Sequence, residues 1–151
     1  MTTFSPRLLK ALLLLAPAPG LAAPPVTVTA AWARATPPGV TTAAAYLTVT
    51  NEGPADRLLG ASSPAARQLL LHLEIEEHET QQMRQLESVE VPAHGSVELA
   101  PGRMHLMLVG LVAALKPDET IKMTLRFEHA GDITIDVPVR DGRLAPEHRH
   151  H

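Results

Sequence analysis

The stretch TIKMTLRFE, residues 120–128, decides the fold class, because hydrophobic and polar side chains alternate along its whole length. The hydrophobic positions are Ile121, Met123, Leu125 and Phe127. Successive side chains of a β-strand point to opposite faces, so this alternation predicts a strand with one buried face. Residues 129–132 predict a hairpin loop, and the alternation resumes at Ile133, Ile135 and Val137 before Pro138. The segment therefore predicts a β-hairpin with one hydrophobic face.

Short strand-like segments separated by proline, glycine and asparagine extend back from this hairpin to residue 26. The segments are 26–34, 43–50, 57–62, 68–76, 82–91, 96–99 and 104–111. Many short strands with frequent turn signals predict an all-β sandwich or barrel. Residues 63–70 could form a helical turn, and the acidic run EIEEHETQQ, residues 74–82, is most simply a solvated loop.

The composition fits a single globular domain. The chain has 151 residues, of which 45% are hydrophobic and only 3% are aromatic, so Leu, Val, Ile, Ala and Met must form the core. We find no internal repeat and no linker between domains. The formal net charge is −3 and no basic patch is present, which argues against a nucleic-acid-binding function.

The first residues predict a secretory signal peptide. Arg7 and Lys10 precede an apolar run, residues 11–15, that is too short to span a bilayer, and Gly20-Leu21-Ala22 offers a cleavage site. We therefore expect a cleaved signal at residues 1–22, a domain at 23–140 and a flexible tail at 141–151. A retained N-terminal anchor is the alternative. The mature protein is expected to be exported and not inserted in the membrane.

The chain contains no cysteine, which excludes disulfides and every function that needs a thiolate. The exported domain must fold without disulfides, and it cannot form a Cys-based zinc site or the copper–thiolate bond of a blue-copper electron carrier. We also find no nucleophile with a plausible base and no recognisable acid pair, so we do not expect an enzyme.

The segment GRMHLMLVG, residues 102–110, has the composition of a buried strand but contains a histidine and two methionines. His105 and Met107 share one face, and Met104 lies on the other. Core packing is one explanation for this pair of side chains. The other is a site for a soft metal ion.

Two residues upstream favour the metal site. His72 alternates out of phase with the leucines beside it, and Met83 is isolated among polar residues. Together the four residues read His72, ten residues, Met83, twenty-one residues, His105, one residue, Met107. Two imidazoles and two thioethers suit Cu(I), because thioether sulfur is soft and a neutral ligand set disfavours oxidation to Cu(II).

This His-x10-Met-x21-His-x-Met spacing resembles the periplasmic copper chaperones for the copper-A site of cytochrome c oxidase (PCuAC-like). The segments AWARATPPG, AAAYLTVTN, DRLLGASSPAA and PGRMHLMLVGL also look like that family, so the resemblance covers nearly the whole mature chain. It implies a cupredoxin-like Greek-key β-sandwich that binds Cu(I) and delivers it to the binuclear copper centre. The implied ligands are His72, Met83, His105 and Met107, and the implied partner is subunit II of the oxidase or an assembly factor.

One position departs from the family pattern. Many relatives have a methionine two residues after the first histidine, where this chain has Glu74, a harder ligand that could assist Cu(II) capture or have no role. His78 could have a secondary role, whereas His94 and His129 fall in turns and are expected on the surface. The tail histidines His148, His150 and His151 could bind Cu(II) at an auxiliary site.

Three functions remain open on these residues. The first is a monomeric copper chaperone that binds and transfers the ion without catalysis. A copper-buffering or copper-resistance protein would use the same site, and one sequence does not separate the two. A metal-free structural β-sandwich predicts no selective affinity for Cu(I).

Overall fold

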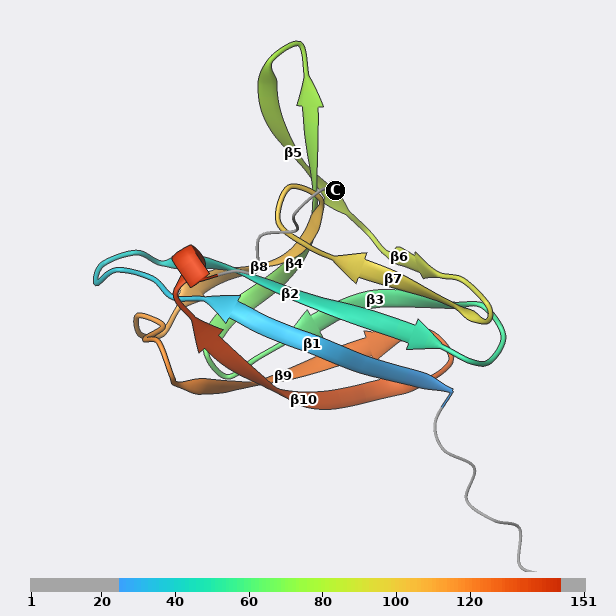
Figure 1. The fold of residues 1–151 in the computed structure, drawn as a ribbon. Coiled ribbons are helices and arrows are strands. Elements are labelled where there is room, and N and C mark those ends of the chain that lie inside the picture. Colours follow the sequence, from blue (N-terminus) through green and yellow to red (C-terminus); the bar gives the residue numbers. More distant parts are fainter. Residues whose placement is uncertain (1–24, 145–151) are drawn as a thin grey trace, which may run out of the picture.

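The computed structural model describes residues 25–144 (Figure 1). The predicted signal at residues 1–22 and tail residues 145–151 lie outside the described residues. Within them the chain consists of strands and one short 3-10 helix, η1 (Gly142–Leu144). None of the described segments is a helix of the length and apolarity needed to cross a membrane.

Ten strands form the fold. They are β1 (Val26–Arg34), β2 (Thr42–Asn51), β3 (Asp56–Ser62), β4 (Ala66–Glu77), β5 (Thr80–Leu86), β6 (Val89–Val91), β7 (Gly95–Leu99), β8 (Met104–Leu111), β9 (Thr120–Phe127) and β10 (Gly131–Arg140). Their order is β5-β4-β8-β2-β1-β10-β9-β3-β6, with β7 paired to β2. Neighbours are antiparallel except β1 and β10, which pair in parallel.

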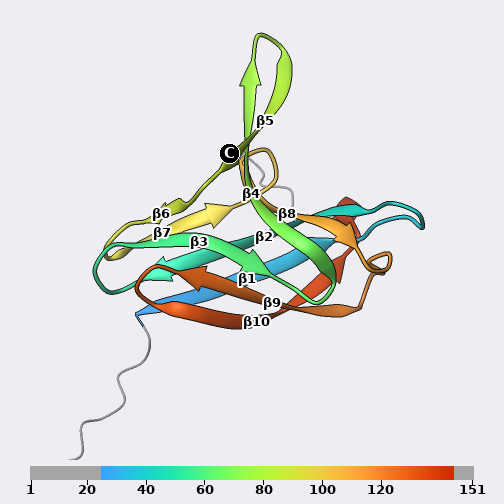
Figure 2. The same ribbon diagram turned by 180° about the vertical axis from the view of Figure 1, so that it is seen from behind.

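The strands form the two layers of a sandwich. One layer holds β5, β4, β8, β2, β7 and β1, the other holds β10, β9, β3 and β6, and the short β1–β10 ladder joins them at one edge. The strands β1 and β2 lie nearer the viewer in Figure 1, and β3 and β9 lie nearer in Figure 2, which shows the molecule from behind. The chain crosses between layers after β2, β3, β5, β6 and β8. This arrangement confirms the cupredoxin-like Greek-key β-sandwich.

The hydrophobic core lies between the layers. Met123, Leu125 and Phe127 of β9 are buried, as their alternation predicts, while Thr124 bonds Thr134 across the outer face of the β9–β10 hairpin. Leu106 and Leu108 of β8 are also fully buried. Their burial fixes the register of β8, because a shift of one residue would exchange the two faces of the strand.

Three expectations about strand boundaries were wrong. Strand β10 continues through Pro138 to Arg140 because Val139 pairs with Ala33 of β1, which extends the ladder. Residues 63–70 contain no helical turn: the Ser63 hydroxyl donates to the Lys122 carbonyl and accepts from the Ala65 amide, and β4 begins at Ala66. The single strand expected at residues 82–91 is two strands, because β5 pairs with β4 whereas β6 pairs with β3 in the other layer.

The acidic run at residues 74–82 is a β-ribbon rather than a loop. Strands β4 and β5 pair as far as Glu77 and Thr80, and His78 and Glu79 form a two-residue turn with positive φ angles of 51° and 63°. Such a turn matches the twist of a two-stranded ribbon. The ribbon stands away from the sandwich body in both views (Figures 1 and 2). Every residue of β5 except Leu86 is exposed.

Candidate metal centre

The two predicted histidine ligands meet on the outer face of one layer. His72 of β4 lies directly opposite His105 of β8 in the antiparallel ladder. Their ring centroids are 5.6 Å apart and the ring planes cross at 77°. Residues opposite each other on paired strands share a face. The neighbours Leu71 of β4 and Leu106 of β8 are buried in the core, so both imidazoles lie on the outer face.

The two methionines lie on the same face. Met107 follows His105 by two residues along β8 and is opposite Leu70 of β4. Met83 of β5 is opposite Glu74, while Gln85 is opposite His72, so Met83 is diagonal to His72 across the ribbon. The exposed fraction of Met83 is 57%, whereas Met107 is half-buried. The fold thus gathers residues that lie up to 35 positions apart in sequence.

A pocket of about 470 Å³ lies over this part of the sheet. Met83, His105, Met107 and Glu74 contribute to its lining, and loop residues close the other sides. His72 does not line the pocket, but it lies beside His105. The structure therefore brings three of the four predicted residues to one pocket and places the fourth against it.

The protonation state of His105 suits a metal ligand. Its exposed fraction is 4%, and burial, followed by the nearby charge of His72, lowers its pKa below the ordinary value of 6.5, although Glu74 opposes this shift. The imidazole is therefore neutral at pH 7 and has a free nitrogen lone pair.

His72 has a buried atom without a partner. Its Nδ1 has no hydrogen-bond partner among the described residues. A buried polar atom without a partner normally costs about 1–3 kcal/mol, so such an atom calls for an explanation. A bound metal ion would supply one, because an imidazole nitrogen is a common metal ligand.

The remaining candidate donors are less well placed. His78, His94 and His129 are exposed residues in turns, so the surface location expected of His94 and His129 is confirmed. His148, His150 and His151 lie outside the described residues. Between residues 25 and 144, no three His, Asp or Glu side chains gather in a way that could hold a metal ion. A site on this face therefore needs the methionine sulfurs.

Sequence analysis missed the aromatic neighbours of the histidine pair. Tyr46 of β2 packs on His105 with ring centroids 6.4 Å apart, and Trp32 of β1 packs on Tyr46 at 4.7 Å. The alternation of β2 could have placed Tyr46 on the outer face. Nothing in the sequence indicates that β2 pairs with β8, so the contact between Tyr46 and His105 could not be foreseen.

The fold and the His/Met cluster define a cupredoxin-like domain with a candidate soft-metal site, and comparisons with known proteins agree. The family model described as "Putative lipoprotein LpqE-like" matches residues 26–139. A relative from Leifsonia xyli subsp. xyli, "Putative lipoprotein Lxx21020", is 38% identical over 125 residues, which cover 82% of this chain and 74% of the relative.

Solved structures give the same result. The copper-bound PCuAC domain from PmoF2 is 30% identical, with a TM-score of 0.66, and the match covers 78% of this chain and 93% of that domain. The solution structure of CuI-DR1885 from Deinococcus radiodurans is 29% identical, with a TM-score of 0.63, and covers 82% and 83% of the two chains. The chain belongs to the LpqE-like family, which is the family of PCuAC domains.

Proposed function

We propose that this protein is an exported copper chaperone that carries one Cu(I) ion as cargo on His72, Met83, His105 and Met107. The observation that carries the proposal is the opposed His72–His105 pair beside a pocket lined by both methionines. Related PCuAC domains are described as copper-bound and as containing Cu(I), which supports the same cargo here.

The donor set fits Cu(I) better than harder ions. Neutral imidazole and thioether ligands leave the site without negative charge, and soft sulfur favours the monovalent ion. Zn(II) and Cu(II) are better served by additional imidazole or carboxylate ligands. Glu74 lies opposite Met83 and lines the pocket, so it is the residue that could assist capture of Cu(II).

The location of Met83 suggests how the ion leaves. His105 and Met107 are held by β8 inside the sheet, whereas Met83 is on the projecting ribbon and is the most exposed of the four residues. An incoming thiolate of an acceptor can replace Met83 first and then displace the other ligands in turn. The chain itself contains no cysteine, so it has no thiolate to compete with the acceptor.

We further propose that the acceptor is subunit II of cytochrome c oxidase, or an assembly factor, and that the monomeric protein acts in the periplasm. The predicted signal at residues 1–22 supports export, and the lipoprotein descriptions of the relatives agree with it. Copper buffering by the same site is the second candidate function, since nothing in the His/Met cluster distinguishes storage from delivery.

An anaerobic Cu(I) titration against a chromogenic chelator tests the site. The parent chain should hold one tight equivalent, and His72→Ala/Met83→Leu should lose it. The matched control is His129→Ala/Met104→Leu, which removes the same side chains from an exposed turn and from the core face of β8. Equal competition by both variants would reject the four-residue site, and no competition by the parent chain would favour a metal-free structural module.

Delivery is separated from buffering by a transfer experiment. The Cu(I)-loaded protein is mixed with the reduced copper-binding domain of oxidase subunit II, either directly or across a dialysis membrane. A chaperone transfers copper faster on direct contact, because ligand exchange needs a complex. Equal rates in both arrangements would indicate release to solution, which is the behaviour of a buffer.

A further inference from the structure

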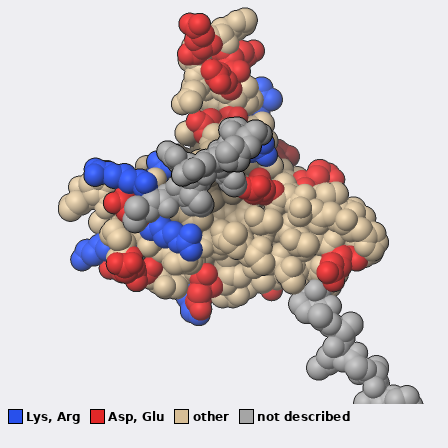
Figure 3. All heavy atoms as spheres, in the orientation of Figure 1, with Lys and Arg blue, Asp and Glu red and all other residues tan. Residues whose placement is uncertain are grey.

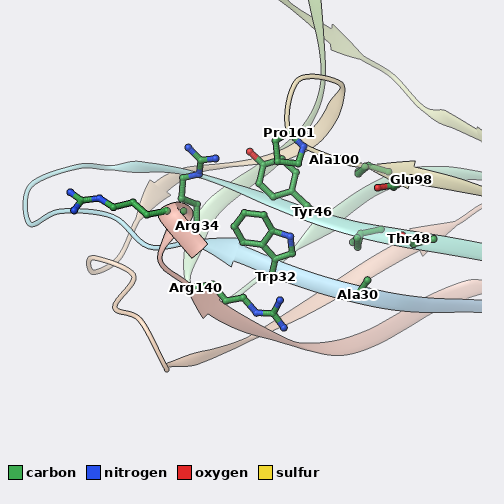
Figure 4. Close-up of a pocket in the computed structure, with 13 residues that line it drawn as sticks. Ala30, Trp32, Arg34, Tyr46, Thr48, Glu98, Ala100, Pro101 and Arg140 are labelled. Atoms are coloured by element: carbon green, nitrogen blue, oxygen red, sulfur yellow. The ribbon is translucent and has the colours of Figure 1, made fainter. Parts of the chain in front are cut away.

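A second cavity, of about 600 Å³, lies beside the metal pocket (Figure 4). It is formed by β1, β2, the end of β7, the end of β10 and η1. Trp32 and Tyr46 form its aromatic wall, and Arg34, Arg140 and Arg143 supply its cations. A volume of this size is within the range of small-ligand sites.

A β-bulge places the indole in this cavity. In the first half of β1 the even-numbered residues Val26 and Val28 pack toward the core. In the second half the odd-numbered residues Ala31 and Ala33 do so, which means that the strand changes face between Val28 and Ala31. The register shifts between Thr29 and Trp32, and Ala30 has a φ of 53°, which is strained for a residue with a Cβ. Without the bulge Trp32 would point into the core. Strain of this kind is concentrated at functional sites.

Two arginines of the cavity are neighbours in the β1–β10 ladder, and neither forms an ion pair among the described residues. Arg34 and Arg140 lie directly opposite each other on β1 and β10. Like charges at such positions repel. Each of the four ion pairs found among the described residues involves other cations: Arg57, which forms two, Lys122 and Arg126. An anion beside these guanidinium groups would be attracted by both charges.

Basic side chains are most frequent near one end of the sandwich. Lys and Arg side chains gather at the left end of the body in Figure 3, the end to which β1 and β10 point, with several acidic side chains among them, whereas acidic side chains crowd the projecting ribbon. Glu98 is the one carboxylate that lines the cavity, and it lies near Thr48, away from Arg34 (Figure 4). The close approach of Gly142 to Arg34 limits where this guanidinium can move: a Cβ at Gly142 would lie 2.9 Å from its Nε.

We propose that this cavity binds an organic carboxylate with an aromatic or apolar body. A guanidinium group matches a carboxylate through two parallel hydrogen bonds, and Arg34 and Arg140 flank the indole. Trp32 and Tyr46 are largely buried and pack on each other, and the surface that they leave open to the cavity would contact the body of the ligand. The carboxylate belongs either to a free small acid or to an acidic side chain beside an apolar one in a partner protein.

The cavity adjoins the metal pocket but does not depend on copper. Arg34, Tyr46 and Pro101 line both of them, so a bound ligand would be next to His105 through Tyr46. The proposal is tested on the metal-free protein, and its failure would leave the copper site untouched.

The test follows the Trp32 indole N–H by NMR, together with thermal unfolding, in the metal-free full chain. Trp32 is the only tryptophan, so the signal is unambiguous. The probes are benzoate, benzyl alcohol, inorganic phosphate and a capped Phe-Glu-Phe tripeptide. We expect a saturable shift and a raised Tm with benzoate, and neither with benzyl alcohol. If the tripeptide binds at a concentration equal to or lower than that of benzoate, the carboxylate ligand belongs to a protein side chain. If the tripeptide does not bind, the ligand is a free small acid.

The variant Arg34→Gln/Arg140→Gln should bind benzoate at least about tenfold more weakly, or about 1.4 kcal/mol, because it removes the charged hydrogen bonds to the carboxylate. It should retain its fold, since both side chains are exposed. The control Arg84→Gln/Arg126→Gln removes the same charge away from the cavity and should bind as the parent does. The proposal is overturned if benzoate gives no saturable shift, if both variants lose it equally, or if phosphate binds as tightly as benzoate.

Discussion

His72 and His105 lie opposite each other on β4 and β8, with ring centroids 5.6 Å apart and nearly perpendicular rings. His105 is buried and neutral at pH 7, and the Nδ1 of His72 has no hydrogen-bond partner in the part of the chain that the structure describes. We expect them to contribute differently to stability and similarly to copper binding, and single substitutions separate these contributions.

His72→Ala should abolish tight Cu(I) binding and should not destabilise the metal-free protein by more than about 1 kcal/mol. The substitution removes a buried Nδ1 atom that has no hydrogen-bond partner between residues 25 and 144. Chelator competition and urea unfolding measure the two effects. With copper at about 1,000 times its dissociation constant, the parent should gain about 4 kcal/mol, and the variant should not. Retention of that gain by the variant would remove His72 from the site.

Met83→Leu should increase the rate of Cu(I) loss to a competing thiol and weaken binding by about tenfold or more, or about 1.4 kcal/mol. Leucine keeps the hydrophobic volume but lacks the sulfur ligand. Because Met83 is largely exposed, the free energy of unfolding should be unchanged. The control is Met104→Leu, which lies beside His105 in sequence but packs against the core. An unchanged exchange rate at unchanged affinity would contradict the proposed order of ligand release.

Asp56 makes stability depend on pH at the far end of the sandwich. Its carboxylate accepts hydrogen bonds from the backbone amides of Arg57 at 2.7 Å and of His129 and Ala130 at 2.9 Å each. Burial alone would raise the pKa of Asp56, but these hydrogen bonds and the charge of His129 outweigh it and lower the pKa below its ordinary value.

A carboxyl group with a lowered pKa in the folded state stabilises the fold above its unfolded pKa of about 4, and this contribution disappears as the pH falls through the folded pKa. Asp56→Asn should therefore cost about 1–3 kcal/mol at pH 7 and progressively less in acid. Urea unfolding from pH 7 to pH 2 measures this difference. Asp132→Asn, an exposed residue in a loose ion pair, should have little effect at either end of that range. A constant cost across the whole range would show that the carboxylate charge is not responsible.

Ala30 tests the bulge that turns Trp32 outward. Ala30→Gly should be neutral or stabilise by up to about 1 kcal/mol, because glycine adopts a positive φ without steric cost. Ala30→Val should destabilise by about 1–2 kcal/mol and shift the Trp32 fluorescence, since a β-branched residue resists this conformation. Thermal unfolding and emission spectra measure both effects. Equal behaviour of the two variants would mean that the bulge does not hold Trp32 in place.

The local alternation of hydrophobic and polar residues was enough to predict several strands and the face on which their side chains lie. The alternation of Ile121, Met123, Leu125 and Phe127 predicted β9 and its buried face, because a strand that covers a core must alternate. The same argument assigned His105 and Met107 to the outer face of β8 and Met104 to the inner face, and the structure agrees. The spacing of His72, Met83, His105 and Met107 predicted the ligand set, which remains a prediction.

Tertiary structure decided which strands are neighbours. Periodicity assigns a residue to a face, but it does not say which strand pairs with which, because that depends on contacts between distant segments. For this reason the break between β5 and β6, the opposition of His72 and His105, and the packing of Tyr46 on His105 were visible only in the fold. The bulge at Ala30 is visible only in the pairing of β1 with β2, and Arg34 faces Arg140 only where β10 of the other layer joins β1.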